Sequence, residues 1–190
     1  MLDDTQLVER CRTGDTDALA ELFLRYNERV FRLVYLVTHS RQDAQDITQE
    51  AFIHVIKALR AFDPRKGTFE TWLYAIAVNL ARDHLRRQKR LFSSWHLLEE
   101  SVVCPGSRDE PEHVSLENER QHAIWQAVNE LEEKQRLAVI LRYYLDLSCA
   151  EIAQILRCPE GTVYSRLYYA RLALEKRLGE FQGRLAWSYV

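Results

Sequence analysis

Hydrophobic side chains recur every three or four residues through the first ninety positions, which is the spacing of one face of an α-helix. The spacing predicts four helices. The first helix covers about 3–13, with Leu7, Val8 and Cys11 facing inward. The inward positions of the second are Leu19, Leu22, Phe23, Tyr26, Val30, Leu33, Val34 and Val37. Those of the third are Ala44, Ile47, Ala51, Val55, Ala58 and Phe62, and those of the fourth are Phe69, Trp72, Leu73, Ile76, Ala77 and Leu80. Gly14 ends the first helix, and Pro64 and Gly67 indicate a turn before the fourth.

The same spacing returns after residue 130 and predicts a second group of helices. One covers 133–144, and the next begins at Ser148, with Glu151 three residues later as in a capping box. Pro159 suits the first position of a last helix. The inward stripe of that last helix is Val163, Leu167, Ala170, Leu174 and Leu178.

Residues 147–167 have the pattern of a helix-turn-helix motif. Ala150 and Ala153 are small where the two helices are expected to cross closely. Gly161 and Thr162 begin the second helix, where a backbone can approach a phosphate. This segment therefore predicts a contact with DNA.

Composition supports an all-α chain. Only 6 Gly and 4 Pro occur, which is typical of few, short connections, and 47% of residues are hydrophobic, enough for ordinary cores. These values argue against β-sandwiches, turn-rich solenoids and low-complexity chains.

Charge divides the chain into three parts, although the total is only −2. Residues 91–120 carry 2 basic and 7 acidic groups, whereas the flanking parts are weakly basic. We therefore expect two small helical domains, 1–91 and 119–190, joined by a flexible acidic linker at 92–118.

The sequence lacks the signals of several classes of protein. The chain has no apolar run of membrane-spanning length and no signal-peptide pattern near its start, so we expect a cytoplasmic protein with no membrane contact of its own. The four cysteines are expected to be free thiols. Ligand spacings for a metal and catalytic motifs are missing, so neither a cofactor nor a metal is expected.

The outer face of the third predicted helix suggests a protein-docking surface. It carries Asp46, Gln49 and Glu50 around an exposed Ile53, with Lys57 and Arg60 further along. A single exposed isoleucine is common and often has no role. An apolar anchor with a polar rim is also typical of a binding site.

The exposed face of the fourth predicted helix suggests binding of single-stranded nucleic acid. Asn79, Arg82 and Arg86 follow each other at helical spacing, and Arg87 extends the row. Such a charge run is often only a solvated face. Four aromatic residues lie just upstream, however: Phe62, Phe69, Trp72 and Tyr74. Basic groups hold phosphates, and aromatic rings stack on unpaired bases.

These motifs together resemble the extracytoplasmic-function (ECF) branch of the sigma-70 family. Residues 25–33 resemble region 2.1, 43–53 resemble region 2.2, 69–83 resemble regions 2.3 and 2.4, and 133–171 resemble region 4. The resemblance implies a non-enzymatic factor that binds core RNA polymerase and directs transcription from promoter DNA. It also implies an anti-sigma factor as inhibitor.

The resemblance assigns roles to residues in the first domain. Asp46, Gln49, Glu50 and Ile53 would dock on the clamp helices of the polymerase β′ subunit. A second set would capture the melted non-template strand of the minus-10 element, with a base flipped into a pocket near the 63–68 turn. That set is Lys57, Arg60, Phe62, Trp72, Asn79, Arg82, Arg86 and Arg87.

The second domain would read the duplex minus-35 element and contact the β flap, while the acidic linker would follow the polymerase's basic nucleic-acid path. The minus-35 set is Gly161, Thr162, Tyr164, Ser165, Arg166, Tyr168, Tyr169 and Arg171. The family often has Lys or Arg where this chain has Tyr164 and Tyr169. Fewer phosphate contacts would make binding weaker, less salt-dependent or differently specific.

Three alternatives remain open on the sequence alone. One is a helix-turn-helix regulator that binds operator DNA by itself as a dimer. Another is a helical metal-dependent enzyme that uses His84 and nearby acids. The third is a polymerase-binding adaptor that reads no DNA.

Overall fold

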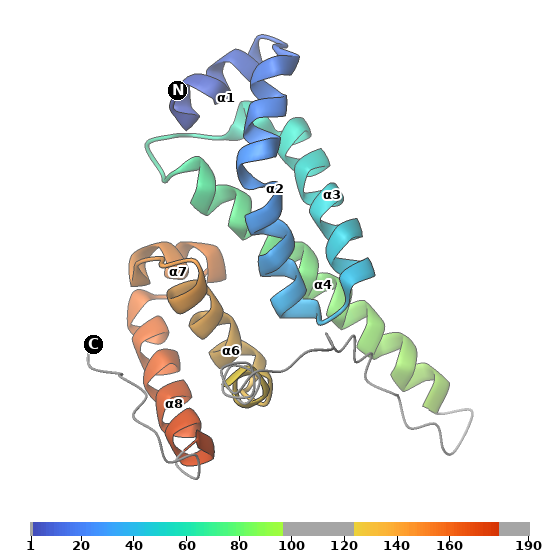
Figure 1. The fold of residues 1–190 in the computed structure, drawn as a ribbon, viewed down its shortest axis with the longest axis vertical. Coiled ribbons are helices and arrows are strands. Elements are labelled where there is room, and N and C mark those ends of the chain that lie inside the picture. The colour runs from blue at the N-terminus through green and yellow to red at the C-terminus, as the bar shows by residue number, and fades with distance from the viewer. Residues whose placement is uncertain (1, 97–123, 179–190) are drawn as a thin grey trace, which may run out of the picture. The chain divides into compact units, whose positions relative to one another are not determined.

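The structure is a computed structural model that describes residues 2–96 and 124–178. Every regular element in these ranges is helical, as the sequence predicted (Figure 1). The elements are α1 (Asp4–Arg12), α2 (Thr16–Thr38), α3 (Arg41–Ala58), the 3₁₀ turn η1 (Leu59–Ala61), α4 (Phe69–His96), α6 (Glu133–Val139), the π-helical η2 (Ile140–Tyr144), α7 (Cys149–Leu156) and α8 (Glu160–Leu178). Residues 124–129 are also helical.

The helices fall into two compact units. The first contains α1 to α4 with η1, and the second contains α6, η2, α8 and most of α7. Helix α4 continues to His96, past residue 91, where the first domain was expected to end. The rest of the predicted linker, 97–118, lies outside the described residues.

In the first unit, α2, α3 and α4 pack side by side and α1 packs on α2 (Figure 1). The predicted stripes supply most of the core: Leu7, Val8, Leu22, Tyr26, Val30, Leu33, Val34, Val37, Ala44, Ile47, Ala51, Val55, Phe69, Leu73 and Ala77 are buried. The fourth stripe is wider than predicted, because α4 contacts both α2 and α3. Val78 and Ala81 are buried too, while Ile76 and Leu80 are only half-buried.

Tyr74 is a core residue, which corrects its expected place among aromatics available to DNA. Its ring is fully buried, and its hydroxyl donates a hydrogen bond of 2.8 Å to the Glu70 carboxylate. Arg29 donates to the same carboxylate oxygen at 3.1 Å. Burial, helped by this acceptor, raises the pKa of the Tyr74 hydroxyl far above its ordinary value. The Glu70 carboxylate therefore joins Arg29 of α2 to α4, with the Tyr74 hydroxyl as a second, neutral donor.

Asp15 caps the N-terminus of α2. Its carboxylate accepts from the amides of Ala18 (3.0 Å) and Asp17 (2.9 Å) and pairs with Arg10 at 2.7 Å. The Ala18 hydrogen bond, then that of Arg10, lowers the pKa of Asp15 below its ordinary value of 3.8. The folded chain binds this proton less tightly than the unfolded chain. The stabilisation by the cap is therefore fully present above pH 3.8, the ordinary pKa that applies to the unfolded chain. It is lost as the pH falls through the lower pKa of the folded chain.

An Asp15→Asn variant is expected to be less sensitive to acid. Asparagine is also a good N-cap, but it does not titrate. Urea unfolding followed from about pH 5 to about pH 2 should show a shallower loss of stability for the variant than for wild type. Identical slopes would contradict the assignment of this proton-linked stability to Asp15.

In the second unit, residues 124–131, α6 and α8 share one core. It consists of Ala127, Val128, Leu131, Val139, Ala170, Leu174 and Leu178, with Leu167 partly buried at its edge. The predicted capping box is confirmed: Ser148 N donates to Glu151 Oε2 at 2.9 Å, and Glu151 N donates to Ser148 Oγ at 3.3 Å. Two details differ. Ala150 is exposed rather than placed at the helix crossing, and Pro159 precedes the first residue of α8.

The described residues contain no helix that is both long and apolar enough to span a bilayer. Among them there is also no group of three or more His, Cys, Asp or Glu side chains placed to hold a metal ion. His84 lies beside a single acid, with Nε2 3.2 Å from Asp43 Oδ1. The geometry around His84 thus offers two ligand atoms rather than a metal site.

Candidate nucleic-acid interface

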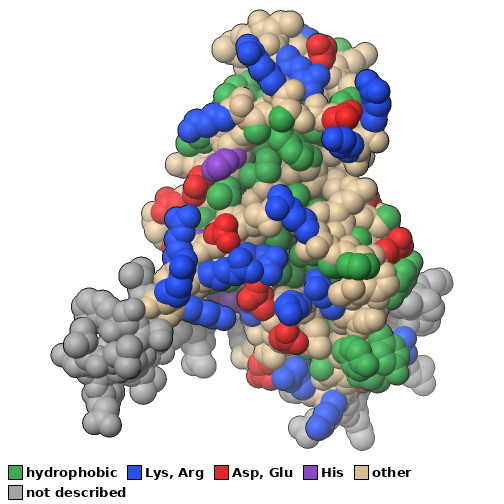
Figure 2. All heavy atoms as spheres, turned by 180° about the vertical axis from the view of Figure 1, so that it is seen from behind, with side chains coloured by type: hydrophobic (Ala, Val, Ile, Leu, Met, Phe, Trp, Pro, Cys, Tyr) green, Lys and Arg blue, Asp and Glu red, His purple; other side chains and the backbone are tan. Residues whose placement is uncertain are grey.

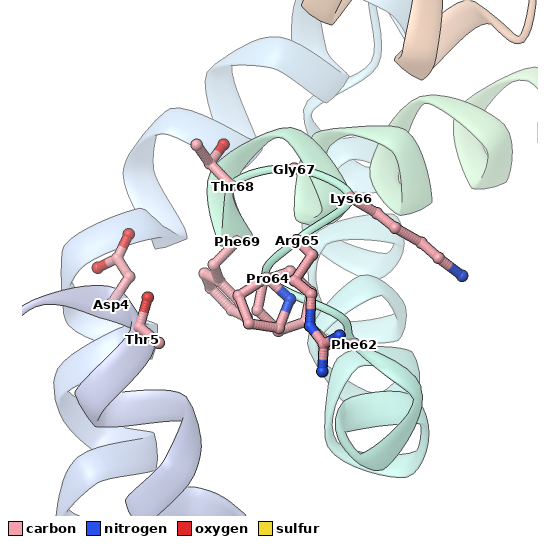
Figure 3. A pocket seen from close by; sticks show the side chains of 9 residues that line it. All are labelled: Asp4, Thr5, Phe62, Pro64, Arg65, Lys66, Gly67, Thr68 and Phe69. Atoms are coloured by element: carbon pink, nitrogen blue, oxygen red, sulfur yellow. The ribbon is translucent and has the colours of Figure 1, made fainter.

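A pocket of about 460 Å³ lies where the 63–68 turn meets α1 (Figure 3). Its lining is Asp4, Thr5, Phe62, Pro64, Arg65, Lys66, Gly67, Thr68 and Phe69. The volume is in the ordinary range for small-molecule sites. Figure 3 shows Asp4 and Thr5 on one side of the opening and the turn residues on the other, with Lys66 extending away from α1. The pocket is thus at the turn that the resemblance had assigned to a flipped base.

Hydrogen bonds fix the shape of the turn. Asp63 Oδ1 accepts from the amide of Arg65 at 3.1 Å, and Thr68 Oγ1 caps α4 by accepting from the amide of Thr71 at 3.1 Å. The guanidinium of Arg12, on α1, donates to the carbonyl oxygens of Leu59 (3.3 Å) and Phe62. The turn is therefore held from both ends and from α1.

Aromatic rings form the inner wall of the pocket. Phe62 lies 5.2 Å from Trp72 and 5.9 Å from Phe69, measured between ring centroids, and Tyr26 adds a ring 5.6 Å from Phe69. Phe62 itself is only 6% exposed, so it is not the free stacking platform that the sequence suggested. Trp72 is half-buried. Of these four rings, Phe62 and Phe69 line the pocket, and neither presents an exposed ring face.

Two lining residues, Asp4 and Thr5, were not predicted. The Asp4 carboxylate pairs with Arg25 Nη1 at 2.5 Å and accepts from the Tyr26 hydroxyl. Burial and this acceptor raise the pKa of Tyr26, which stays a neutral donor. Sequence spacing did not indicate that Asp4 and Thr5 line the pocket, because α1 reaches the turn only through the tertiary packing of this unit.

The second half of α4 carries a basic row beyond the pocket. Asn79 and Arg82 are half-buried, and Arg86 and Arg87 are exposed. Figure 2 shows Lys and Arg side chains gathered toward the end of α4 at which the grey residues begin. Arg86 Nη1 lies 3.4 Å from Asp83 Oδ1, a surface contact that water screens strongly. Arg86 can therefore exchange this contact for one with a phosphate.

The outer face of α3 is exposed as predicted, and it is more apolar than expected. Asp46, Gln49 and Glu50 are exposed, and Ile53 is 49% exposed. Ile56, one turn further along, is 52% exposed. Ile56 was not predicted as part of this face, although its three-residue spacing from Ile53 is visible in the sequence. Lys57 and Arg60 are exposed on the same segment. Two adjacent isoleucines are a stronger anchor than one.

The outward face of α8 carries most of the predicted duplex-reading residues. Gly161, Tyr164, Ser165, Tyr168, Tyr169 and Arg171 are exposed, and Thr162 and Arg166 are half-buried. The Tyr164 hydroxyl donates to Glu160 Oε1 at 3.1 Å, which raises the pKa of Tyr164. Arg166 Nη1 lies 3.6 Å from Cys158 Sγ, and Arg171 Nε donates to Glu175 at 2.8 Å. Three exposed tyrosines thus occupy a face with two arginines.

Comparison with known proteins matches both units. Residues 22–91 match the family model of sigma-70 region 2, and residues 121–174 match that of sigma-70 region 4. The chain is 40% identical over 185 residues to the ECF RNA polymerase sigma-E factor of Escherichia coli, covering 93% of this chain and 95% of the relative. It is 38% identical over 181 residues to the RNA polymerase sigma-H factor of Pseudomonas aeruginosa, covering 92% and 93%.

Solved structures share the fold. CnrH, solved with the cytosolic domain of CnrY, has a TM-score of 0.68 at 20% identity and matches 95% of this chain and 99% of its own. The sigma factor RpoE of Bartonella quintana, solved with the anti-sigma factor NepR, has a TM-score of 0.66 at 20% identity, covering 84% and 96%. Together with the sequence relatives, these matches show that the chain belongs to the sigma-70 family as an ECF sigma factor, a transcription initiation factor and not an enzyme.

Proposed function

We propose that the first unit captures the melted non-template strand of the minus-10 element. The observation that carries this proposal is the pocket at the 63–68 turn, with aromatic rings as its wall and a basic row along α4. Unstacking and unpairing a base costs roughly a few kcal/mol, and its contacts with the protein must offset this cost. A preformed pocket and nearby phosphate-holding cations together supply that compensation.

The basic row on α4 is proposed to hold the phosphates of the same strand. Asn79, Arg82, Arg86 and Arg87 follow one another along the helix, as a backbone track requires. Each neutralised phosphate of a single strand contributes about 0.7 to the salt dependence of log K. Lys57 and Arg60 are exposed and are proposed as further contacts.

The outward face of α8 is proposed to read the duplex minus-35 element. A helix in the major groove reads base edges with polar side chains and contacts thymine methyl groups with apolar surface. Tyr164, Tyr168 and Tyr169 offer both, but they neutralise no phosphate. We therefore expect this contact to depend less on salt than one made mainly by lysine and arginine.

The outer face of α3 is proposed to dock on the β′ clamp helices of core RNA polymerase. The exposed pair Ile53 and Ile56, with acidic and amide groups beside it, supports this role. The second unit is proposed to contact the β flap. An anti-sigma factor is the proposed inhibitor, since a sigma factor that is switched off must have these faces covered.

Run-off transcription on a randomised promoter library tests these assignments. Core RNA polymerase with the full chain is expected to enrich two separated elements, and polymerase alone is expected to enrich neither. Products that show no sequence enrichment would contradict the proposed reading of DNA.

An Arg166→Ala variant is expected to weaken only the upstream contact. Loss of one phosphate contact to duplex lowers affinity about fivefold near 0.15 M salt and reduces the salt slope by about 0.9. Promoters that depend on the minus-35 element should lose transcription accordingly. Arg177→Ala removes an equal charge at the end of α8, where Arg177 pairs with Glu130 at 3.1 Å, and should leave transcription unchanged. Equal behaviour of the two variants would argue against Arg166 as a DNA contact.

A further inference from the structure

One wall of the pocket at the 63–68 turn comes from α1. Asp4 and Thr5 line it from the first turn of that helix, opposite the turn residues (Figure 3). Both precede residues 22–91, which match sigma-70 region 2. A guest in the pocket would therefore meet a carboxylate and a hydroxyl as well as aromatic rings.

Asp4 is held in a fixed orientation. Its side chain is 25% exposed, its Oδ1 lies 2.5 Å from Arg25 Nη1, and its Oδ2 accepts from the Tyr26 hydroxyl. Arg25 is itself fixed by Glu21 at 2.7 Å and by the Leu2 carbonyl oxygen at 3.1 Å. A side chain held by two donors on α2 is preorganised, so a guest does not have to order it.

A carboxylate is an unusual group to find in a pocket for a polyanion. It repels phosphate, and the positive side chains of the lining, Arg65 and Lys66, are on the turn rather than on α1. An ionised carboxylate only accepts hydrogen bonds, and its two oxygens have about four lone-pair sites. Arg25 and Tyr26 use two of them. The remaining capacity suits a hydrogen-bond donor on a base edge.

Base edges differ in what they offer to such an acceptor. Adenine, cytosine and guanine each carry an exocyclic amino group, and acidic side chains pair with the amino group of cytosine in direct readout. Thymine has no amino group. Its ring N–H stands between two carbonyl oxygens, which a carboxylate repels.

We propose that Asp4 is a specificity-determining residue, which makes the pocket accept a base with an exocyclic amino group and reject thymine. Thr5, at the rim, can donate or accept beside it. This inference rests on the proposed capture of the melted strand, and it adds a chemical rule for the base that enters the pocket.

Base analogues test the rule without changing the fold. The wild-type chain with core RNA polymerase first selects its preferred single strand from a random pool. Each base of that strand is then replaced by its analogue without the amino group: 2-pyrimidinone for cytosine, purine for adenine and hypoxanthine for guanine. At one position, the replacement is expected to lower the affinity of the complex for the strand about tenfold, which is the effect of losing one charge-assisted hydrogen bond.

The same strands are then measured with Asp4→Asn. An amide can donate as well as accept, so this variant is expected to lose most of the tenfold discrimination at that one position and to tolerate thymine there. Asp17→Asn makes the same change in the first turn of α2, outside the pocket lining, and should behave as wild type. Tyr26→Phe removes only the hydroxyl that orients Asp4 and should give an intermediate result.

The outcomes separate this inference from the function on which it rests. If no position responds to loss of the amino group, or if Asp4→Asn responds as strongly as wild type, Asp4 does not read the base although the strand still binds. If the wild-type complex prefers no single strand at all, capture of the melted strand is itself wrong. If Asp4→Asn still binds strands that carry replacements at the other positions with wild-type affinity, the variant is folded.

Discussion

An Ile53→Asp variant is expected to lose about 100-fold or more of its affinity for core RNA polymerase while keeping its fold. Ile53 and Ile56 are half-exposed on one face of α3, and the core of the unit does not depend on either side chain. An apolar anchor at the centre of an interface contributes about 2 kcal/mol or more, and a buried carboxylate in its place adds a desolvation cost. Each 1.4 kcal/mol, roughly, is a factor of ten in affinity.

Fluorescence anisotropy of the labelled chain titrated with core polymerase measures this affinity directly. Ile53→Leu keeps the apolar surface and should stay within about threefold of wild type, since volume-conserving exchanges between apolar residues cost little. Leu24→Asp places the same charge on α2, at a side chain that is 78% exposed, and should bind normally. Wild-type affinity of Ile53→Asp would show that this face of α3 is not the docking surface.

Replacing Arg82, Arg86 and Arg87 together with alanine is expected to weaken binding of the melted strand about 50-fold near 0.15 M salt. Three contacts to a single strand contribute about 2 to the slope of log K against log salt concentration. Losing them near 0.15 M salt therefore lowers the affinity about 50-fold. Docking on core polymerase should not change, because these side chains are on α4 and the docking face is on α3.

Titrations at several salt concentrations, with a preformed bubble template and the polymerase complex, test both the loss and the reduced slope. A second triple variant, with alanine for Arg10, Arg32 and Arg41, removes the same charge from α1 to α3 and serves as control. Run-off transcription that survives the α4 variant intact would favour the alternative of a polymerase-binding adaptor that reads no DNA.

The helices could be predicted from the sequence because their signals are local. The stripes of α1, α2 and α8 repeat at helical spacing, and the capping box of Ser148 and Glu151 lies within four residues. The fourth stripe was predicted less well. Helix α4 packs against two helices, so its buried arc is wider than one stripe and includes Tyr74.

The pocket shows where local patterns stop being informative. Phe62 and the turn were predicted as its parts, but Asp4 and Thr5 come from a helix more than fifty residues away in the sequence. Such a contact depends on how α1 packs in the folded unit, and no spacing in the sequence encodes it. Phe62 was expected to be available for stacking, whereas the packing of Trp72 and Phe69 buries it.

Permanganate probing of thymines in the promoter tests the central claim most directly. Permanganate attacks unpaired thymines, so it reports whether the non-template strand of the minus-10 element is open. With core polymerase and the wild-type chain, non-template thymines in that element are expected to react at a rate that falls in the α4 triple variant. A complex that binds the promoter but leaves these thymines paired and unreactive would contradict the proposed capture of the melted strand.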